Sequence, residues 1–289
     1  MRYAIAYFPY LLMKGVGEIK FGDTVVWNFS TKAAEYLPDE KIRTKVGQLI
    51  SMNIGHRDRP IENVGIVSLN SESLFDQNDN QLFNTAMEAR LLLFLCGLSE
   101  NMKLETEDPN AGHYHTTSEN YSPVFQNFDT ESEFVSERTG FIVQMSIGGY
   151  TLGETKYRRP SFVPTPMNFR LDSEFLKRLF LLKKRSKKLF RKILLATEAI
   201  FEAYSNNPSL MINPRIMAQA RAFEIILELP DVGKTEKFKQ LIDLYASLNV
   251  RDERKRSYWV RFSKNPRREH GNIKKKWAQS FYSLRSKII

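Results

Sequence analysis

Residues 172–204 read DSEFLKRLFLLKKRSKKLFRKILLATEAIFEAY, and this stretch decides the fold of the C-terminal part of the chain. Its apolar side chains recur at helical spacing on one face, and its lysines and arginines crowd the other. Asp172-Ser173 is a suitable N-cap, and Ser205-Asn206-Asn207-Pro208 is a clear stop. The pattern therefore predicts one long amphipathic helix from Asp172 to about Tyr204.

Three further helices are expected downstream. One begins at Asn213-Pro214 and stops at Leu229-Pro230, and the next runs from about Thr235 to Leu248. The last begins near Asn272, and its apolar residues at i+4, i+3 and i+4 predict an inward stripe. That stripe consists of Trp277, Phe281, Leu284 and Ile288. Four amphipathic helices over residues 170–289 predict an all-α four-helix bundle.

Residues 1–166 mix strand and helix patterns, so the whole chain is expected to be α+β, with an N-terminal accessory or sensor domain. β-branched or aromatic runs predict strands at Tyr3–Phe8, Thr24–Phe29, Val64–Leu69 and Gly140–Ile147, the last followed by a turn at Gly148-Gly149 and a hairpin arm at Tyr150–Leu152. Helices are predicted from Ser30-Thr31, over Lys41–Met52, and from Asn80 to Gly97 or about Asn101. Glu105–Tyr121 is polar and predicts an exposed loop, and residues 158–166 predict an extended linker.

Charge is distributed unevenly along the 289 residues, whose formal total is +10. Residues 170–289 carry 28 Lys and Arg against 12 Asp and Glu, a net +16, whereas residues 1–169 carry a net −6. Such asymmetry indicates a polyanionic partner for the basic part. The alternative is that the charges serve solubility and attraction between the two parts.

The composition excludes several classes of protein. A chain with 42% hydrophobic and 26% charged residues can bury a core and is not disordered as a whole. No apolar run approaches the roughly 20 residues that cross a bilayer, and the N-terminus is interpreted as a strand and not a signal peptide. Cys96 is the one cysteine. We expect it to be a buried structural thiol in a reducing, cytoplasmic compartment.

A family resemblance arises from two of the predicted helices. Residues 220–230 read ARAFEIILELP, and residues 277–289 read WAQSFYSLRSKII. Together they resemble the Apea-like branch of the HEPN proteins. The resemblance implies a helical bundle, usually a homodimer. Many members of the family are metal-independent ribonucleases of bacterial defence and toxin systems, and others are non-catalytic RNA-binding or scaffold proteins.

The family signature is an Arg, a polar residue and, a few residues later, a His on the last core helix. Arg285 and Ser286 match its first half, and the sequence ends where the His would follow. The resemblance thus implies that Arg285 and Ser286 belong to a catalytic site, and that this chain as it stands lacks the base and is inactive. We expect no metal and no cofactor.

The chemistry of metal-free RNA cleavage explains these residue types. A base must take the proton of the ribose 2′-hydroxyl, and a cation must hold the charge that develops on phosphate. Arg suits the second role through bidentate contacts with phosphate oxygens. The alternative for Arg285 is an interface arginine paired with a carboxylate. Glu224 and Arg221 are interpreted as structural unless they face Arg285.

Three basic segments form the predicted RNA footprint. Cations interleaved with Tyr258 and Trp259 are typical of proteins that bind single-stranded nucleic acid. One alternative is a solvated helix face with a mobile loop. Another is a basic helix that lies on an acidic membrane, but we expect no membrane contact. His113 and His115 are interpreted as surface residues and not as metal ligands. The nucleic-acid-binding residues predicted are Lys184, Lys188, Arg191, Arg254, Arg256, Arg261, Arg267, Arg268, Lys274 and Lys275.

Three functions remain open at the level of the sequence. The first is an endoribonuclease of a defence or toxin system. The second is a non-catalytic RNA-binding regulator, which would bind RNA in a salt-sensitive manner without cutting it. The third is a scaffold that docks a protein or ligand through its acidic N-terminal domain.

Overall fold

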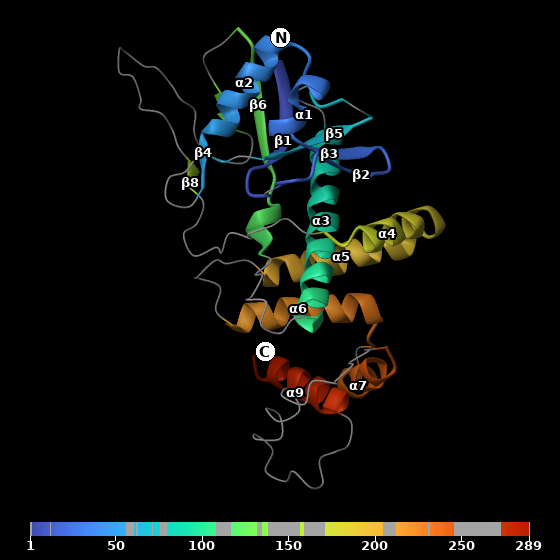
Figure 1. Ribbon diagram of the computed structural model, residues 1–289. Helices are drawn as coiled ribbons and strands as arrows, with labels where there is room; N and C mark the ends of the chain where they lie inside the picture. Colours follow the sequence, from blue (N-terminus) through green and yellow to red (C-terminus); the bar gives the residue numbers. More distant parts are fainter. Residues whose placement is uncertain are drawn as a thin grey trace. The chain divides into compact units, whose positions relative to one another are not determined.

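The computed structural model describes residues 2–11, 13–55, 61, 63–70, 72–75, 80–107, 117–131, 135–137, 157–158, 171–204, 212–230, 232–245 and 273–288. These residues form an N-terminal antiparallel sheet with helices, followed by a helical region. The α+β class is therefore confirmed (Figure 1). The predicted strand at Gly140–Ile147, the turn at Gly148-Gly149, the arm at Tyr150–Leu152 and most of the linker lie outside the described residues.

The main sheet has six strands in the order β2-β3-β5-β1-β6-β7, and every pairing is antiparallel. Three strands confirm predictions: β1 (Arg2–Phe8), β3 (Thr24–Asn28) and β5 (Gly65–Leu69). The other strands are β2 (Glu18–Phe21), β6 (Val124–Asp129) and β7 (Val135–Glu137). A separate parallel pair joins β4 (Asn53–Ile54) to β8 (Tyr157–Arg158).

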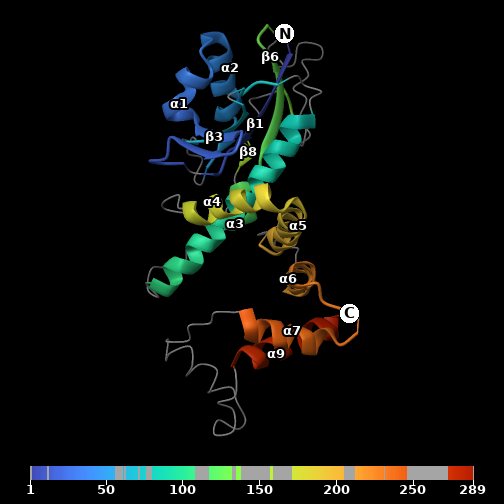
Figure 2. The same cartoon turned by 90° about the vertical axis from the view of Figure 1, so that its right-hand side faces the viewer.

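Both faces of the central strand are covered, because Ala4 through Phe8 are each at most 2% exposed. On one face lie α1 (Phe29–Tyr36) and α2 (Glu40–Ser51). Leu37, the C-cap of α1, and Val46 and Leu49 of α2 pack in a cluster with Ile5 and Trp27. The other face is covered by α3 (Asn80–Glu107), which packs on β1 and β5 (Figure 2). The first helix begins earlier than predicted, since Asn28 and not Ser30 or Thr31 is its N-cap.

The central helix α3 is longer than its sequence pattern predicted, and the expected exposed loop at Glu105–Tyr121 is wrong at both of its described ends. Residues 105–107 continue the helix, and Ser118–Tyr121 form a short 3-10 helix, η2, with Ser118, Asn120 and Tyr121 buried. By length and composition, Asn80–Asn101 is apolar enough to cross a membrane, but half of that segment is buried inside the protein. Its contacts with β1, β5, η2 and the next helix are those of a core helix.

The single long helix predicted over 172–204 is two helices. Asp172 is the N-cap as expected, and α4 (Ser173–Arg185) is followed by α5 (Lys187–Ala203). Ser186 separates them because its φ of −150° and ψ of 92° are those of an extended residue. The chain turns back between the two helices (Figure 1). Near this turn, the Lys183 Nζ lies 5.9 Å from the centroid of Phe180 on α4 and 5.4 Å from that of Phe190 on α5.

The compact units of the chain divide within α5 and not near residues 166–170. Residues 1–197 and 204–207 form the first unit, and residues 198–203 and 208–289 form the second. Helix α4 and most of α5 thus belong with the sheet, where α4 packs on α3 and β2. The described helices of the second unit are α6 (Ile212–Leu227), α7 (Lys234–Tyr245) and α9 (Ile273–Ile288), close to the bounds predicted for the last three helices.

The second unit has a small core, and the inward face of α9 differs from the predicted stripe. Ala278 and Tyr282 are at most 1% exposed and pack with Phe238 and Ile242 of α7. Of the predicted stripe, Trp277 and Phe281 are only partly buried and Leu284 is 45% exposed. Trp277 and Phe281 nevertheless pack against this core, so the inward face lies between the predicted stripe and the line of Ala278 and Tyr282, and Leu284 is the predicted residue that turns outward.

Candidate nucleic-acid interface

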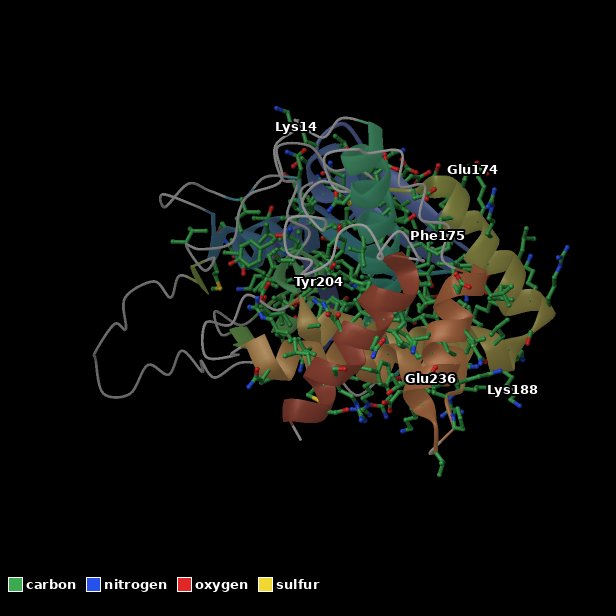
Figure 3. The ribbon with its side chains drawn as sticks, turned by 90° about the horizontal axis from the view of Figure 1, so that it is seen from below. Lys14, Glu174, Phe175, Lys188, Tyr204 and Glu236 are labelled. Carbon is green, nitrogen blue, oxygen red and sulfur yellow. The ribbon has the colours of Figure 1, made fainter. Side chains whose placement is uncertain are left out.

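The surface of the hairpin formed by α4 and α5 carries an unbroken run of positive charge. Between Lys177 and Lys192 the chain has nine Lys and Arg and no Asp or Glu. Figure 3 shows Glu174 and Lys188 toward opposite ends of this pair of helices. Three of the predicted nucleic-acid-binding residues, Lys184, Lys188 and Arg191, lie on this surface, and each is exposed.

Only a few of these cations are neutralised by carboxylates. Lys177 pairs with Glu174 at 2.6 Å, and Lys183 pairs with Glu88 of α3 at 2.5 Å. The remaining exposed cations around Ser186 pair with no carboxylate among the residues that the structure describes. We call this set the basic hairpin: Lys184, Arg185, Lys187, Lys188 and Arg191.

The positions of these cations are only partly explained by helix stability. Lys184 and Arg185 occupy the last turn of α4, where positive charge is favourable beside the carbonyl end of the helix dipole. Lys187 and Lys188 occupy the first turn of α5, where positive charge is unfavourable and no acidic residue compensates. The basic hairpin therefore maintains a positive potential at some cost to its own helix.

The base of the hairpin is firmly attached to the first unit. Asp172 is buried, and its carboxylate accepts a hydrogen bond from the Ser99 hydroxyl at 2.8 Å and another from the Phe175 amide at 3.0 Å. The ring of Phe180 packs against Phe21 of β2, with centroids 6.0 Å apart. The cations are thus presented by an anchored scaffold.

A second cluster surrounds Arg285, the residue that the family resemblance assigns to a catalytic site. Its guanidinium lies 3.0 Å from the Glu224 carboxylate on α6, and the Lys234 Nζ lies 3.4 Å from the other oxygen of the same carboxylate. The Tyr282 hydroxyl donates to Glu224 at 3.5 Å. The side chains of Arg285, Glu224 and Lys234 are 21%, 23% and 23% exposed.

This geometry matches the alternative interpretation of Arg285, an arginine paired with a carboxylate, and it brings Glu224 but not the exposed Arg221 to that arginine. Burial, and then the charge of Glu224, raise the pKa of Tyr282 above its ordinary value, so this phenol remains protonated near neutral pH. The Ser286 hydroxyl donates to the Tyr282 carbonyl of its own helix at 2.9 Å. Both cations of the cluster thus pair with Glu224, and its tyrosine is no base.

The other predicted site residues cannot be placed against these clusters. Lys274 and Lys275 belong to α9, but their side chains lie outside the described residues. The same is true of the whole of His113, His115, Tyr258 and Trp259 and of the loop arginines of the predicted footprint. Those arginines are Arg254, Arg256, Arg261, Arg267 and Arg268. Within the described ranges, no three His, Cys, Asp or Glu side chains gather as a metal site would need.

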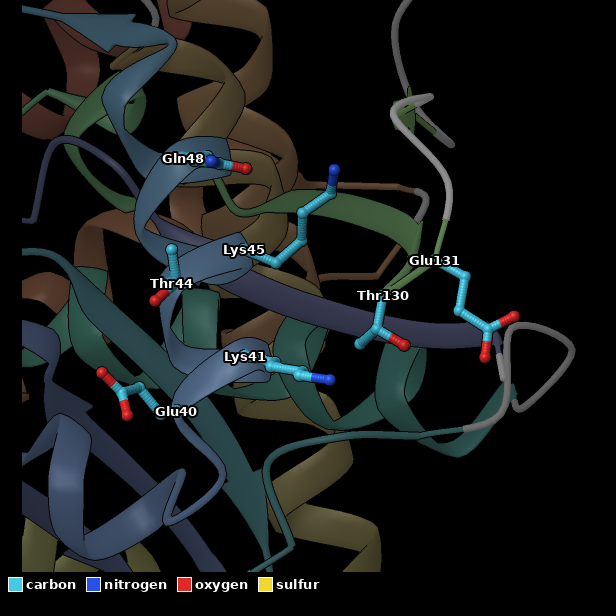
Figure 4. A pocket seen from close by; sticks show the side chains of 7 residues that line it. All are labelled: Glu40, Lys41, Thr44, Lys45, Gln48, Thr130 and Glu131. Carbon is cyan, nitrogen blue, oxygen red and sulfur yellow. The ribbon is translucent and has the colours of Figure 1, made fainter.

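Sequence reasoning did not predict a shallow polar pocket between α2 and the end of β6 (Figure 4). Residues of α2 form one wall, and Thr130 and Glu131 form the other. Its lining contains two lysines, Lys41 and Lys45, and two carboxylates, Glu40 and Glu131, so the pocket has no net preference for either sign of charge. No sequence signal could have found it, because its two walls are separated by about 80 residues of chain.

Comparison with known protein families, with curated proteins and with solved structures finds no match to this chain. The resemblance to HEPN proteins therefore rests on residues 220–230 and 277–289 alone.

Proposed function

We propose that this protein binds RNA through the basic hairpin. The observation that carries the proposal is the group of five exposed cations around Ser186, which pair with no carboxylate among the described residues and lie in a stretch that contains no acidic residue. Phosphate contacts by Lys and Arg supply most of the non-specific affinity for nucleic acids. The choice of RNA among polyanions is supported by the family resemblance.

The positions of Lys187 and Lys188 strengthen the proposal. Cations that served only solubility could occupy any exposed position, and a helix N-terminus is the least favourable one. Sequences that break a local stability rule often do so at functional sites. A bound phosphate chain would relieve the repulsion that these lysines experience in the free protein.

The test compares two triple variants of the full chain with the same change in net charge. Lys187→Gln, Lys188→Gln and Arg191→Gln together remove part of the basic hairpin, whereas Lys14→Gln, Lys41→Gln and Lys237→Gln remove exposed lysines elsewhere. Fluorescence anisotropy with labelled RNA should show binding weakened by about tenfold or more in the first variant and by less than about twofold in the second. An equal loss in both variants, or no RNA binding by the unmodified chain, would refute the proposal.

A metal-independent endoribonuclease, as in defence and toxin systems, is a second candidate function. It is favoured by the partly exposed guanidinium of Arg285, which Glu224 holds from a neighbouring helix. Because this chain lacks the signature His, the test incubates RNA with a version of the protein that carries a His after Ile289, with and without a chelator, and resolves the products on a denaturing gel. Cleavage that survives the chelator and disappears in Arg285→Ala supports this function, and cleavage that needs a metal or persists in the variant rejects it.

A further inference from the structure

The basic hairpin has no aromatic ring available to stack on a base. Phe190 and Phe201 are at most 8% exposed, and Phe180 packs on Phe21 of the sheet. Tyr204 lies edge-on against Phe94, with centroids 5.7 Å apart, and Phe175 is only partly exposed. Proteins that bind single strands without sequence preference combine positive charge with rings on which unpaired bases stack. Among the described residues of α4 and α5, half of that combination is missing.

Apart from arginine and lysine, which can contact guanine, the exposed residues of the hairpin lack groups that read bases. All exposed positions from 177 to 195 are Lys, Arg or Leu. No Asn, Gln, Ser or Thr among them offers the paired donor and acceptor that recognise a base edge. The surface can therefore contact phosphates, but it carries little means of distinguishing one sequence from another.

The cations come from two anchored helices that meet at one turn. Lys184 and Arg185 end α4, and Lys187, Lys188 and Arg191 begin α5, so two short rows of charge flank Ser186. Fixed rows of charge suit a ligand whose phosphates are themselves held at fixed spacing. A duplex provides such spacing, and double-stranded RNA is recognised mainly through its shape and backbone.

We infer that the ligand of the basic hairpin is the phosphate backbone of double-stranded RNA, bound without regard to its sequence. This inference rests on the proposed function and specifies the class of RNA. It differs from the single-stranded ligand predicted from Tyr258 and Trp259, which lie outside the described residues.

An acidic membrane surface is the main competitor for the basic hairpin. Leu181 is 53% exposed and has Lys177, Arg178, Lys184 and Arg185 at the i±3 and i±4 positions around it. Leu189 and Leu195 are also exposed, at 41% and 49%. Leu189 and Leu195 lie about 120° apart on α5 at 100° per residue. An interfacial helix gathers its apolar residues on one face, which these leucines do not.

The test measures anisotropy of the full chain with three labelled probes. They are an RNA duplex of about 20 base pairs, a second duplex of unrelated sequence, and an unstructured single strand with the same number of phosphates. We expect both duplexes to bind about equally, and about tenfold or more tightly than the single strand. The variant Leu181→Gln should leave duplex binding within about twofold, and the triple variant Lys187→Gln, Lys188→Gln, Arg191→Gln should lose it.

The contrary outcomes separate this inference from the proposed function. A single strand that binds as tightly as the duplexes overturns the inference and leaves RNA binding in place. Absence of binding to every RNA overturns both. Vesicles of anionic phospholipid that displace the duplex, with a vesicle affinity that falls in Leu181→Gln, would assign the surface to membranes and overturn the inference as well.

Discussion

Cys96 shows how its surroundings set the chemistry of a single residue. It is fully buried in α3, and burial, followed by the negative charge of Asp172, raises the pKa of its thiol to about 12. The thiolate is the reactive form of cysteine, and an ordinary thiol has a pKa near 8.5. The prediction that Cys96 is a buried structural thiol is therefore confirmed.

The reactivity of Cys96 should depend strongly on folding. At pH 8 we expect a thiol reagent such as DTNB to label the native protein at least about a hundredfold more slowly than the protein unfolded in guanidinium, because the folded state keeps the thiol protonated and covered. The raised pKa also means that stability falls as the pH rises from the unfolded thiol value of about 8.5 toward 12. Cys96→Ala gives the unlabelled control, and complete labelling of the native protein within seconds would contradict the prediction.

The pair formed by Glu224 and Arg285 could not be predicted at the level of single residues. Both residues were noted in the sequence, but their meeting depends on the rotation of α9, and the predicted stripe left out Ala278 and Tyr282, which are the most deeply buried described residues of that helix. Cys96 was easier because it lies inside a continuous apolar run from Leu91, where any rotation of the helix leads to burial. In a helix that is apolar on one side only, the rotation of the helix decides which residues are buried.

Among the elements, the packing of α3 depends on a close contact between Gly97 and the Tyr121 ring. Gly97 was a candidate C-cap, yet the helix continues to Glu107, and the Tyr121 ring of η2 packs over the glycine. A Cβ added at Gly97 would lie 2.0 Å from the Tyr121 hydroxyl oxygen and 2.9 Å from its ring carbon Cζ. Glycine is thus required at this position for packing, and not to end the helix.

The substitution Gly97→Ala should destabilise the protein in spite of the higher helix propensity of alanine. We expect a loss of about 1–3 kcal/mol, because the Tyr121 ring must move within a packed core. Thermal unfolding followed by circular dichroism measures the loss, with Gly17→Ala as the control, since a Cβ there would meet only the Lys32 Cε at 3.6 Å. An unchanged or raised Tm for Gly97→Ala would show that the close contact is not maintained in solution.

The sequence also predicted the existence and type of the elements better than the residues at which they begin and end. Periodicity located most of the described helices and the strands rich in β-branched residues, but not the break at Ser186. The helical pattern continues across that residue, and the break appears only in the structure, where Ser186 has an extended backbone. The strand β6 was missed because VFQNFD contains amides that are polar by type, although Gln126 is buried and accepts a hydrogen bond from Tyr7 at 2.8 Å.

At the scale of the whole molecule, the charge asymmetry was visible in the sequence, but the place of the basic hairpin was not. Composition assigned the excess of positive charge to one C-terminal bundle. The structure places the hairpin with the acidic sheet unit, because Phe180 packs on β2 and Lys183 pairs with Glu88 of α3. The polyanion-binding surface proposed for the protein therefore belongs to the first compact unit.

The number of phosphates that the protein contacts should appear in the salt dependence of RNA binding. Each contact releases counterions, so the slope of log K against log salt is about −0.7 to −0.9 per contact. If the five cations of the basic hairpin each meet a phosphate, the slope should be about −3.5 to −4.5. The single variant Lys188→Gln should reduce its magnitude by about 1, whereas Lys14→Gln should not change it. A slope near zero, or one that changes equally in the two variants, would mean that the affinity arises from contacts other than those between this hairpin and phosphate.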